Sequence, residues 1–244
     1  VAGERSPTDN LSSAAVKMLS HQDDSPVDST LSEDSDRLSA LSDTIRSAAL
    51  SQIPLTAEDK TMESQLFPRG IYDWDEQQVD MRKINSWRLR LAEVSPVELV
   101  EVHLVNAIAP FILNGQLKSL MTRTASRDKH IVNVSAMEGV FYRAFKRDTH
   151  PHTNMAKASL NMMTRTSAAD YIKDGIHMNS VDTGWINDED PLDIAERKKD
   201  EFGFHPPLDY EDAAARICDP IFAGLNSNEH VWGVFLKDYK VSNW

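Results

Sequence analysis

The segment from His130 to Gly184 constrains the fold more than any other part of the chain. It opens with HIVNVSAMEG, where the β-branched residues Ile131, Val132 and Val134 are followed by small residues. A short apolar run that ends at turn residues is typical of a strand buried on both faces. The segment therefore begins with a predicted strand that ends near Ser135.

A helix and a second strand complete this segment. Apolar or small residues recur at helical spacing between 154 and 173, and Gly175 stands where a C-capping glycine belongs. The residues that mark the buried face are Ala156, Leu160, Met163, Ser167 and Tyr171. The next strand runs from Ile176 to Val181. Two strands joined by a helix form a right-handed parallel βαβ unit, so the sequence predicts an α/β fold.

Composition excludes several classes of protein. The net charge of -12 and the pI near 5.1 argue against a surface for nucleic acid or anionic membranes. The single cysteine, Cys218, excludes an internal disulfide and fits a reducing compartment. We find no apolar run of membrane-spanning length and no signal-peptide pattern at the start. We therefore expect a cytoplasmic protein without membrane insertion.

Residues 1–60 differ from the rest of the chain. They contain 12 serines and 11 acidic residues against 5 basic ones, and no aromatic residue. Such segments bury too little apolar surface to offset the entropy of the chain, so we expect a low-complexity, disordered segment. A flexible tail or insertion is one interpretation, and a phosphorylatable regulatory segment is the other, because acids flank the serines.

A connector and a globular domain follow. Residues 61–94 lack clear periodicity, and Trp74 and Trp87 are expected to anchor them on the folded body. Ser95-Pro96-Val97-Glu98 is a capping box that begins a helix towards Leu120, interrupted by Pro110. This helix is apolar nearly all round, which predicts burial on more than one side. The α/β domain thus spans 95–244.

Three pieces of this domain resemble the carboxyl-terminal half of short-chain dehydrogenases/reductases. They are NVSAMEG, TNMAK and GIHMNSVDTG, and the resemblance runs from about Glu93 to about Leu236. The chain is most similar to a divergent branch with the same QVD…NSW and HPHTNMAK signatures. The resemblance implies a partial Rossmann-like, doubly wound parallel sheet. It also implies ancestral NAD- or NADP-dependent oxidoreduction of a carbonyl or alcohol.

The resemblance assigns candidate catalytic residues but leaves gaps. Lys157 matches the family lysine, and Asn106 matches the asparagine that holds a water in the proton relay, although a plain hydrogen bond to a neighbouring carbonyl is equally open. Ser135 lies one place before the serine position, which Ala136 occupies. Thr153 stands where the family has tyrosine. An alkyl hydroxyl has a pKa far above that of a phenol, so Thr153 cannot replace it as a proton donor.

Nearby residues offer little compensation. His152 is titratable, but it lies one position away on the helix and therefore points in a different direction. Tyr142, in the preceding loop, is a weak substitute.

The cofactor half departs further from the family pattern. The resemblance implies that Lys157, Thr183, Gly184 and Ile186 line the nicotinamide side. The chain has nine glycines and contains no G-x-x-x-G-x-G or G-x-G-x-x-G, the turn that makes room for a pyrophosphate. Asp188 occupies the usual phosphate-binding threonine position, where a carboxylate repels phosphate. NAD or NADP is therefore expected by resemblance, with binding by this chain weak or absent.

Two functions remain open at this stage. The first is a dehydrogenase/reductase-like protein whose activity is impaired or absent. The second is a catalytically silent subunit of the same fold that acts as a structural or interaction module. The strand 131–134 lacks an inner neighbour in the sequence, so either residues from the 1–90 region complete the sheet or another subunit does. We expect a homo-oligomer or another protein subunit as partner, most simply a second copy packed through the helices 95–123 and 154–173. The eight histidines show no metal-site spacing, so no metal is expected.

Overall fold

The computed structural model describes residues 53, 55, 65–73, 76–142 and 146–244. The chain divides into two compact units, 1–61 and 62–244, and the description below concerns the second. The predicted disordered segment 1–60 and Trp74 lie outside the described residues, apart from Ile53 and Leu55.

The second unit is built on a sheet of four strands in the order β1-β2-β3-β4. They are β1 (Lys129–Ser135), β2 (Ile176–Asp182), β3 (Phe235–Lys237) and β4 (Lys240–Ser242). The first three strands are parallel, and β4 returns antiparallel to β3. The predicted βαβ unit is therefore confirmed. The strand β3 begins at Phe235 and continues into a hairpin whose turn residues Asp238 and Tyr239 have positive φ.

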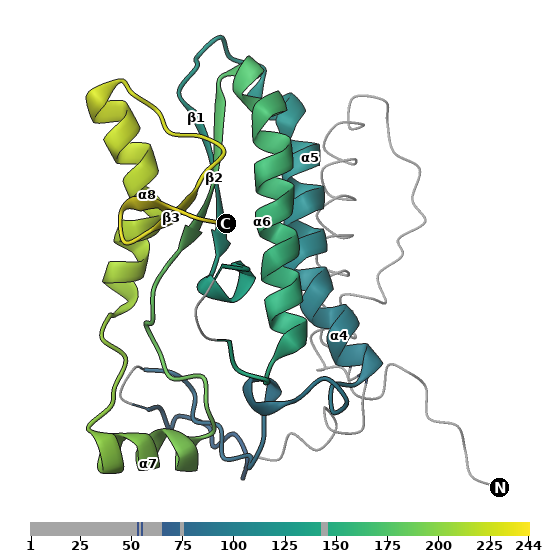
Figure 1. The fold of residues 1–244 in the computed structure, drawn as a ribbon, viewed down its shortest axis with the longest axis vertical. Helices are drawn as coiled ribbons and strands as arrows, with labels where there is room; N and C mark the ends of the chain where they lie inside the picture. The colour runs from purple at the N-terminus through teal and green to yellow at the C-terminus, as the bar shows by residue number, and fades with distance from the viewer. Residues whose placement is uncertain (1–52, 54, 56–64, 74–75, 143–145) are drawn as a thin grey trace, which may run out of the picture. The chain divides into compact units, whose positions relative to one another are not determined.

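Helices cover both faces of this sheet (Figure 1). On one face α6 (Pro151–Tyr171) packs on β1 and β2, beside α4 (Pro96–His103), the π-helical turn η2 (Leu104–Ile108) and α5 (Ala109–Met121). On the other face lies α8 (Tyr210–Ser227), while α7 (Leu192–Phe202) lies below the sheet in the view shown. Short turns of 3-10 helix are η1 (Ser86–Arg88), η3 (Met137–Gly139) and η4 (Ile172–Asp174).

Burial differs sharply between the two central strands. Every residue of β2 is buried, and Ile176 and Met178 form a cluster with Ala168 and Tyr171 of α6. In β1, the residue Val134 is 41% exposed, and only Asn133 and Ser135 are buried. The prediction that β1 is buried on both faces is therefore wrong. Within the described part of the chain β1 pairs only with β2, so its other edge lacks the neighbour that would cover it.

The helical stretch 96–121 also differs from its prediction. Ser95 caps it as expected, because its hydroxyl accepts a hydrogen bond from the Glu98 N–H at 3.1 Å. No residue of α4, η2 or α5 is buried, so the predicted burial on more than one side is wrong. Among the described elements, α6 and β1 pack against this stretch, and large apolar side chains such as Val105 and Phe111 are exposed.

The same stretch contradicts the expectation that the chain has no apolar run of membrane-spanning length. Among the described residues, the continuous helix Pro96–Met121 is long and apolar enough to cross a membrane, judged by length and composition alone. A π-helical turn interrupts it just before Pro110, which lies in the first turn of α5. Such a turn and a proline are common causes of a helix kink.

Candidate functional site

The candidate site lies at the carboxyl end of β1. Ser135 is the last residue of this strand and is 2% exposed, and its buried hydroxyl has no hydrogen-bond partner. A buried hydroxyl without a partner costs free energy, which is why such groups are often reserved for a ligand. Ala136, at the expected serine position, adopts an extended backbone that begins the turn η3. The structure thus places Ser135 at the site, one residue before the expected serine position.

Lys157 faces the same strand end from α6. Its ammonium donates a hydrogen bond to the carbonyl of Val134 at 3.0 Å. Burial lowers the pKa of Lys157 below its ordinary value, although the charge of Glu138 acts in the opposite direction. The helix lies this close because η3 contains Gly139, where a Cβ would be 2.6 Å from the Lys157 backbone.

Thr153 lies on the first turn of α6, one helical turn before Lys157, and is half-buried. Its match to the position of the family's phenol stays a prediction of the sequence spacing. The two suggested substitutes do not reach that position. Tyr142 is 88% exposed, and the buried His152 contacts the Glu98 carboxylate at 3.3 Å.

Asn106 lies in the π-helical turn η2, half-buried beside α6. Its side-chain amide donates to the carbonyl of Val102 at 3.0 Å, four residues earlier. The structure therefore contains the neighbouring-carbonyl hydrogen bond, and π-helical turns are frequent at functional sites. A role of Asn106 in a proton relay stays a prediction.

Sequence reasoning missed a chain of buried polar groups behind the site. Asn133 accepts from Asn114 at 3.0 Å and donates to Thr164 at 2.9 Å, and Ser180 also donates to Thr164 at 2.9 Å. These groups link α5, β1, α6 and β2, so they fix the register of the elements that carry the site. Asn133 inside a β-branched run was the signal available in the sequence.

A buried ion pair was also missed. Asp182 ends β2, accepts from the Met137 N–H at 3.2 Å, and binds the ammonium of Lys237 at 2.9 Å. Burial alone would lower the pKa of Lys237, but the hydrogen bond to Asp182 and the charges of Asp182 and Asp238 raise it overall. The pair joins the carboxyl ends of β2 and β3 beside the site.

The predicted cofactor residues follow β2 in the loop 183–190. Thr183 turns its hydroxyl to the carbonyl of Gly184 at 3.4 Å, and Ile186 is half-buried. Gly184 has φ +82°, and a Cβ there would be 2.4 Å from Leu208 Cδ1. The space above Gly184 is thus filled by a side chain of the protein itself.

The acidic end of this loop is tied down by cations. Asp188 and Asp190 both bind the ammonium of Lys198, the second at 2.8 Å, and Asp190 also binds Arg88 at 2.7 Å. These contacts use the cations near the loop for carboxylates rather than leaving them for a phosphate.

The connector holds the loop as well. Trp87 donates its indole N–H to Glu189 at 3.1 Å, which agrees with its expected anchoring role, and Asn85 donates to the Glu189 carbonyl at 2.7 Å. A cleft of about 660 Å³ lies between the connector and this loop, lined by residues from Phe67 to Trp87 and from Asn187 to Pro206.

These residues do not fit a dinucleotide. The described chain offers no glycine-rich turn at a helix N-terminus that would cradle a pyrophosphate, and its sequence contains none. Lys157 is engaged with Val134, and Asp188 places a carboxylate where a phosphate contact is expected.

Comparison with known proteins places this fold and site in a family. Residues 17–206 match the family model described as enoyl-(acyl carrier protein) reductase. Uncharacterized protein R665 of Acanthamoeba polyphaga mimivirus is 33% identical over 168 residues, which are 66% of this chain and 34% of that protein. The chain therefore spans about a third of that relative.

Solved structures share the fold. The carbonyl reductase Sniffer of D. melanogaster superimposes with a TM-score of 0.52 at 19% identity, covering 67% of this chain and 64% of that one. An NADPH-bound carbonyl reductase from chicken fatty liver gives a TM-score of 0.48 at 20% identity, over 67% and 64%. The first likeness supports the α/β, Rossmann-like fold that the sequence predicted. At this identity it carries the fold alone.

Proposed function

Since the chain belongs to the short-chain dehydrogenase/reductase family, we propose that it keeps the fold and part of the site but does not itself reduce carbonyls. The observation that carries this proposal is the position of Thr153, one turn before Lys157 on α6. Reduction of a carbonyl requires a proton donor there, and a threonine hydroxyl at neutral pH holds its proton too tightly.

The lysine supports the same conclusion. In the family pattern it lowers the pKa of the phenol and holds the nicotinamide ribose. Here its ammonium is bonded to the Val134 carbonyl at 3.0 Å, and there is no neighbouring phenol at Thr153 to activate. The group is retained as an internal contact between α6 and β1.

We propose that the chain acts instead as a structural or interaction module in the cytoplasm. Large apolar side chains are exposed along α4, η2 and α5, including Val100, Val105, Phe111 and Leu117. The family resemblance implies that this helical stretch and α6 together form a four-helix interface between two subunits, so a second copy of this chain is the occupant we propose. Burying such side chains stabilises an interface by about 25 cal/mol per Å².

A second candidate function is oxidoreduction of a carbonyl or alcohol with NAD or NADP. It is favoured by two groups that a silent protein does not require. These are the partnerless hydroxyl of Ser135 and the lowered pKa of Lys157. Both are features of sites that bind and polarise a substrate oxygen.

An assay of reduced-cofactor oxidation separates the two functions. The full chain, the Thr153→Tyr variant and the Lys157→Ala variant are incubated with NADH or NADPH and a panel of small aldehydes and ketones. The proposal predicts no turnover above background for the unaltered chain. Turnover by the unaltered chain that Lys157→Ala abolishes would establish the oxidoreductase instead. Activity that appears only in Thr153→Tyr would identify the missing phenol as the cause of silence.

A further inference from the structure

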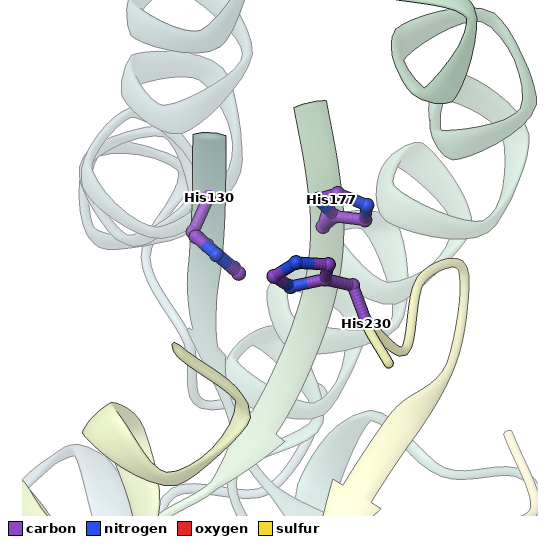
Figure 2. A group of neighbouring side chains, drawn as sticks. All are labelled: His130, His177 and His230. Atoms are coloured by element: carbon purple, nitrogen blue, oxygen red, sulfur yellow. The ribbon is translucent and has the colours of Figure 1, made fainter. Parts of the chain in front are cut away.

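Three histidines far apart in the sequence meet at the amino end of the sheet (Figure 2). His130 and His177 are the second residues of β1 and β2 and face each other in the parallel ladder. His230 reaches towards them from the loop between α8 and β3. One ligand atom from each ring lies within 4.8 Å of the others.

The packing of these rings requires an explanation. The ring centroids of His177 and His230 are 4.3 Å apart, and those of His130 lie 5.3 and 5.2 Å from these two. Among the described residues, Nε2 of His130 and Nδ1 of His230 are buried without a hydrogen-bond partner. Two such nitrogens are costly, because each buried polar atom loses its hydrogen bonds to water.

We propose that His130, His177 and His230 bind a divalent transition-metal ion, zinc foremost, at the amino end of the sheet. Neutral imidazole is a preferred ligand of zinc, at a Zn–N distance of about 2.0–2.1 Å. Tetrahedral ligands at that distance are about 3.3 Å apart. The ligand atoms of the three rings lie within 4.8 Å of one another, so binding requires the rings to approach by side-chain rotation.

The surroundings supply the support that metal-binding histidines need. Nδ1 of His177 faces the carbonyl of Lys129 at 3.3 Å, which directs its other nitrogen away from the backbone. Oδ1 of Asp128 lies 3.1 Å from Nε2 of His230. A carboxylate beside a ligand histidine orients the ring and increases its basicity, and its charge also stabilises a bound cation.

Imidazole binds a metal ion in its neutral form, so binding of an ion here would release any proton that the three rings carry. The ion would tie β1, β2 and the loop before β3 together, far along the strands from Ser135 and Lys157.

Calorimetric titration of the EDTA-stripped full chain with Zn²⁺ tests the site. We expect one ion per chain with a dissociation constant of about 10 µM or tighter. Each of His130→Gln, His177→Gln and His230→Gln should weaken binding by about 100-fold, and Asp128→Asn by about 10-fold. The matched control is His103→Gln, on α4 and bonded only to the Leu99 carbonyl among the described contacts; it should bind as tightly as the parent.

A spectroscopic measurement on the parent chain tests the site without relying on the folding of a variant. Co²⁺ in a four-coordinate site of this kind gives intense visible absorption, which the parent chain should show and the exposed-site variant Asp128→Asn should alter. Absence of saturable 1:1 binding to the parent chain would overturn the proposal. So would Zn²⁺ binding that persists unchanged in all three histidine variants, because the ion would then lie elsewhere in the chain.

Discussion

The two ends of the parallel sheet carry different groups of polar side chains on the same two strands, β1 and β2. At the carboxyl end, Ser135 and Asp182 finish β1 and β2, and their polar groups meet α6 and β3. At the amino end, His130 and His177 lie side by side beneath His230. The carboxyl end carries the residues that the family pattern predicts for a site, with Thr153 at the predicted position of the proton donor. The amino end holds a cluster that the family pattern does not account for.

The difference shows that retained residues and retained chemistry are separate matters. Lys157 is predicted by the family motif, yet its ammonium donates to a backbone carbonyl of β1. The histidines match no motif, yet the sheet register places two of them together and Asp128 supports the third.

The largest effect is expected where α6 meets the carboxyl end of the sheet. In Gly139→Ala the new methyl group would lie 2.6 Å from the backbone of Lys157 and 2.8 Å from Asn161. Backbone cannot move as a side chain does, so the free energy of unfolding should fall by about 3 kcal/mol. Urea unfolding measures this change.

The control for that variant is Gly115→Ala. Gly115 lies inside α5 with nothing near its missing Cβ, so alanine should raise the free energy of unfolding by up to about 1 kcal/mol. Equal effects of the two substitutions would show that η3 and α6 are not in close contact.

A smaller effect is expected at the ion pair beside the site. Lys237→Met leaves the buried Asp182 carboxylate without its cation, so the protein should lose about 2 kcal/mol of stability at pH 7. The same change at the exposed Lys240 of β4 should stay within about 0.5 kcal/mol. Chemical unfolding measures the free energy of unfolding of both variants in parallel. An unchanged value for Lys237→Met would show that the ion pair does not stabilise the fold.

At the histidine end the matching glycine should matter less. In Gly224→Ala the methyl group would lie 2.3 Å from Nδ1 of His230, the end of a side chain that can turn aside. We expect a loss of about 1 kcal/mol, together with weaker Zn²⁺ binding because the ring is displaced. Unfolding and calorimetry on one preparation give both values. Full Zn²⁺ affinity in this variant would contradict a ligand role for His230 in the orientation described.

The smallest expected effect is a change in pH dependence. Folding lowers the pKa of Lys157, so above its folded pKa and below about 10.4 the unfolded chain binds more protons than the native one. The contribution of Lys157 to stability therefore rises with pH through that window. Lys157→Met should lack this part of the rise between pH 7 and pH 10, which unfolding midpoints across that range would detect. Parallel curves for both proteins would contradict the burial of the ammonium.

Much of the fold was predictable because local patterns agree with tertiary structure. The β-branched run before Ser135, the helical face of α6 and Gly175 at φ +69° together specify the βαβ unit. The predictions failed where burial depends on what lies beside an element. Val134 is exposed because β1 has no described neighbour on one side, and periodicity cannot report a missing strand.

The candidate site was predictable only as far as a motif reached. The spacing to Lys157 placed Thr153 at the position expected for the phenol. The histidine cluster could not be found from sequence, because 47 and 53 residues separate its members and the register of β1 on β2 creates it. The Asp182–Lys237 pair could not be found from sequence for the same reason.

The central claim is that this chain retains the family fold without a working dinucleotide site. Calorimetric titration of the full chain with NADH and with NADPH tests it most directly. Because the sequence contains no glycine-rich turn and Leu208 fills the space above Gly184, we predict no saturable heat at up to about 1 mM cofactor. Saturable binding of either cofactor with a dissociation constant of about 10 µM, weakened by Lys157→Ala, would contradict the claim.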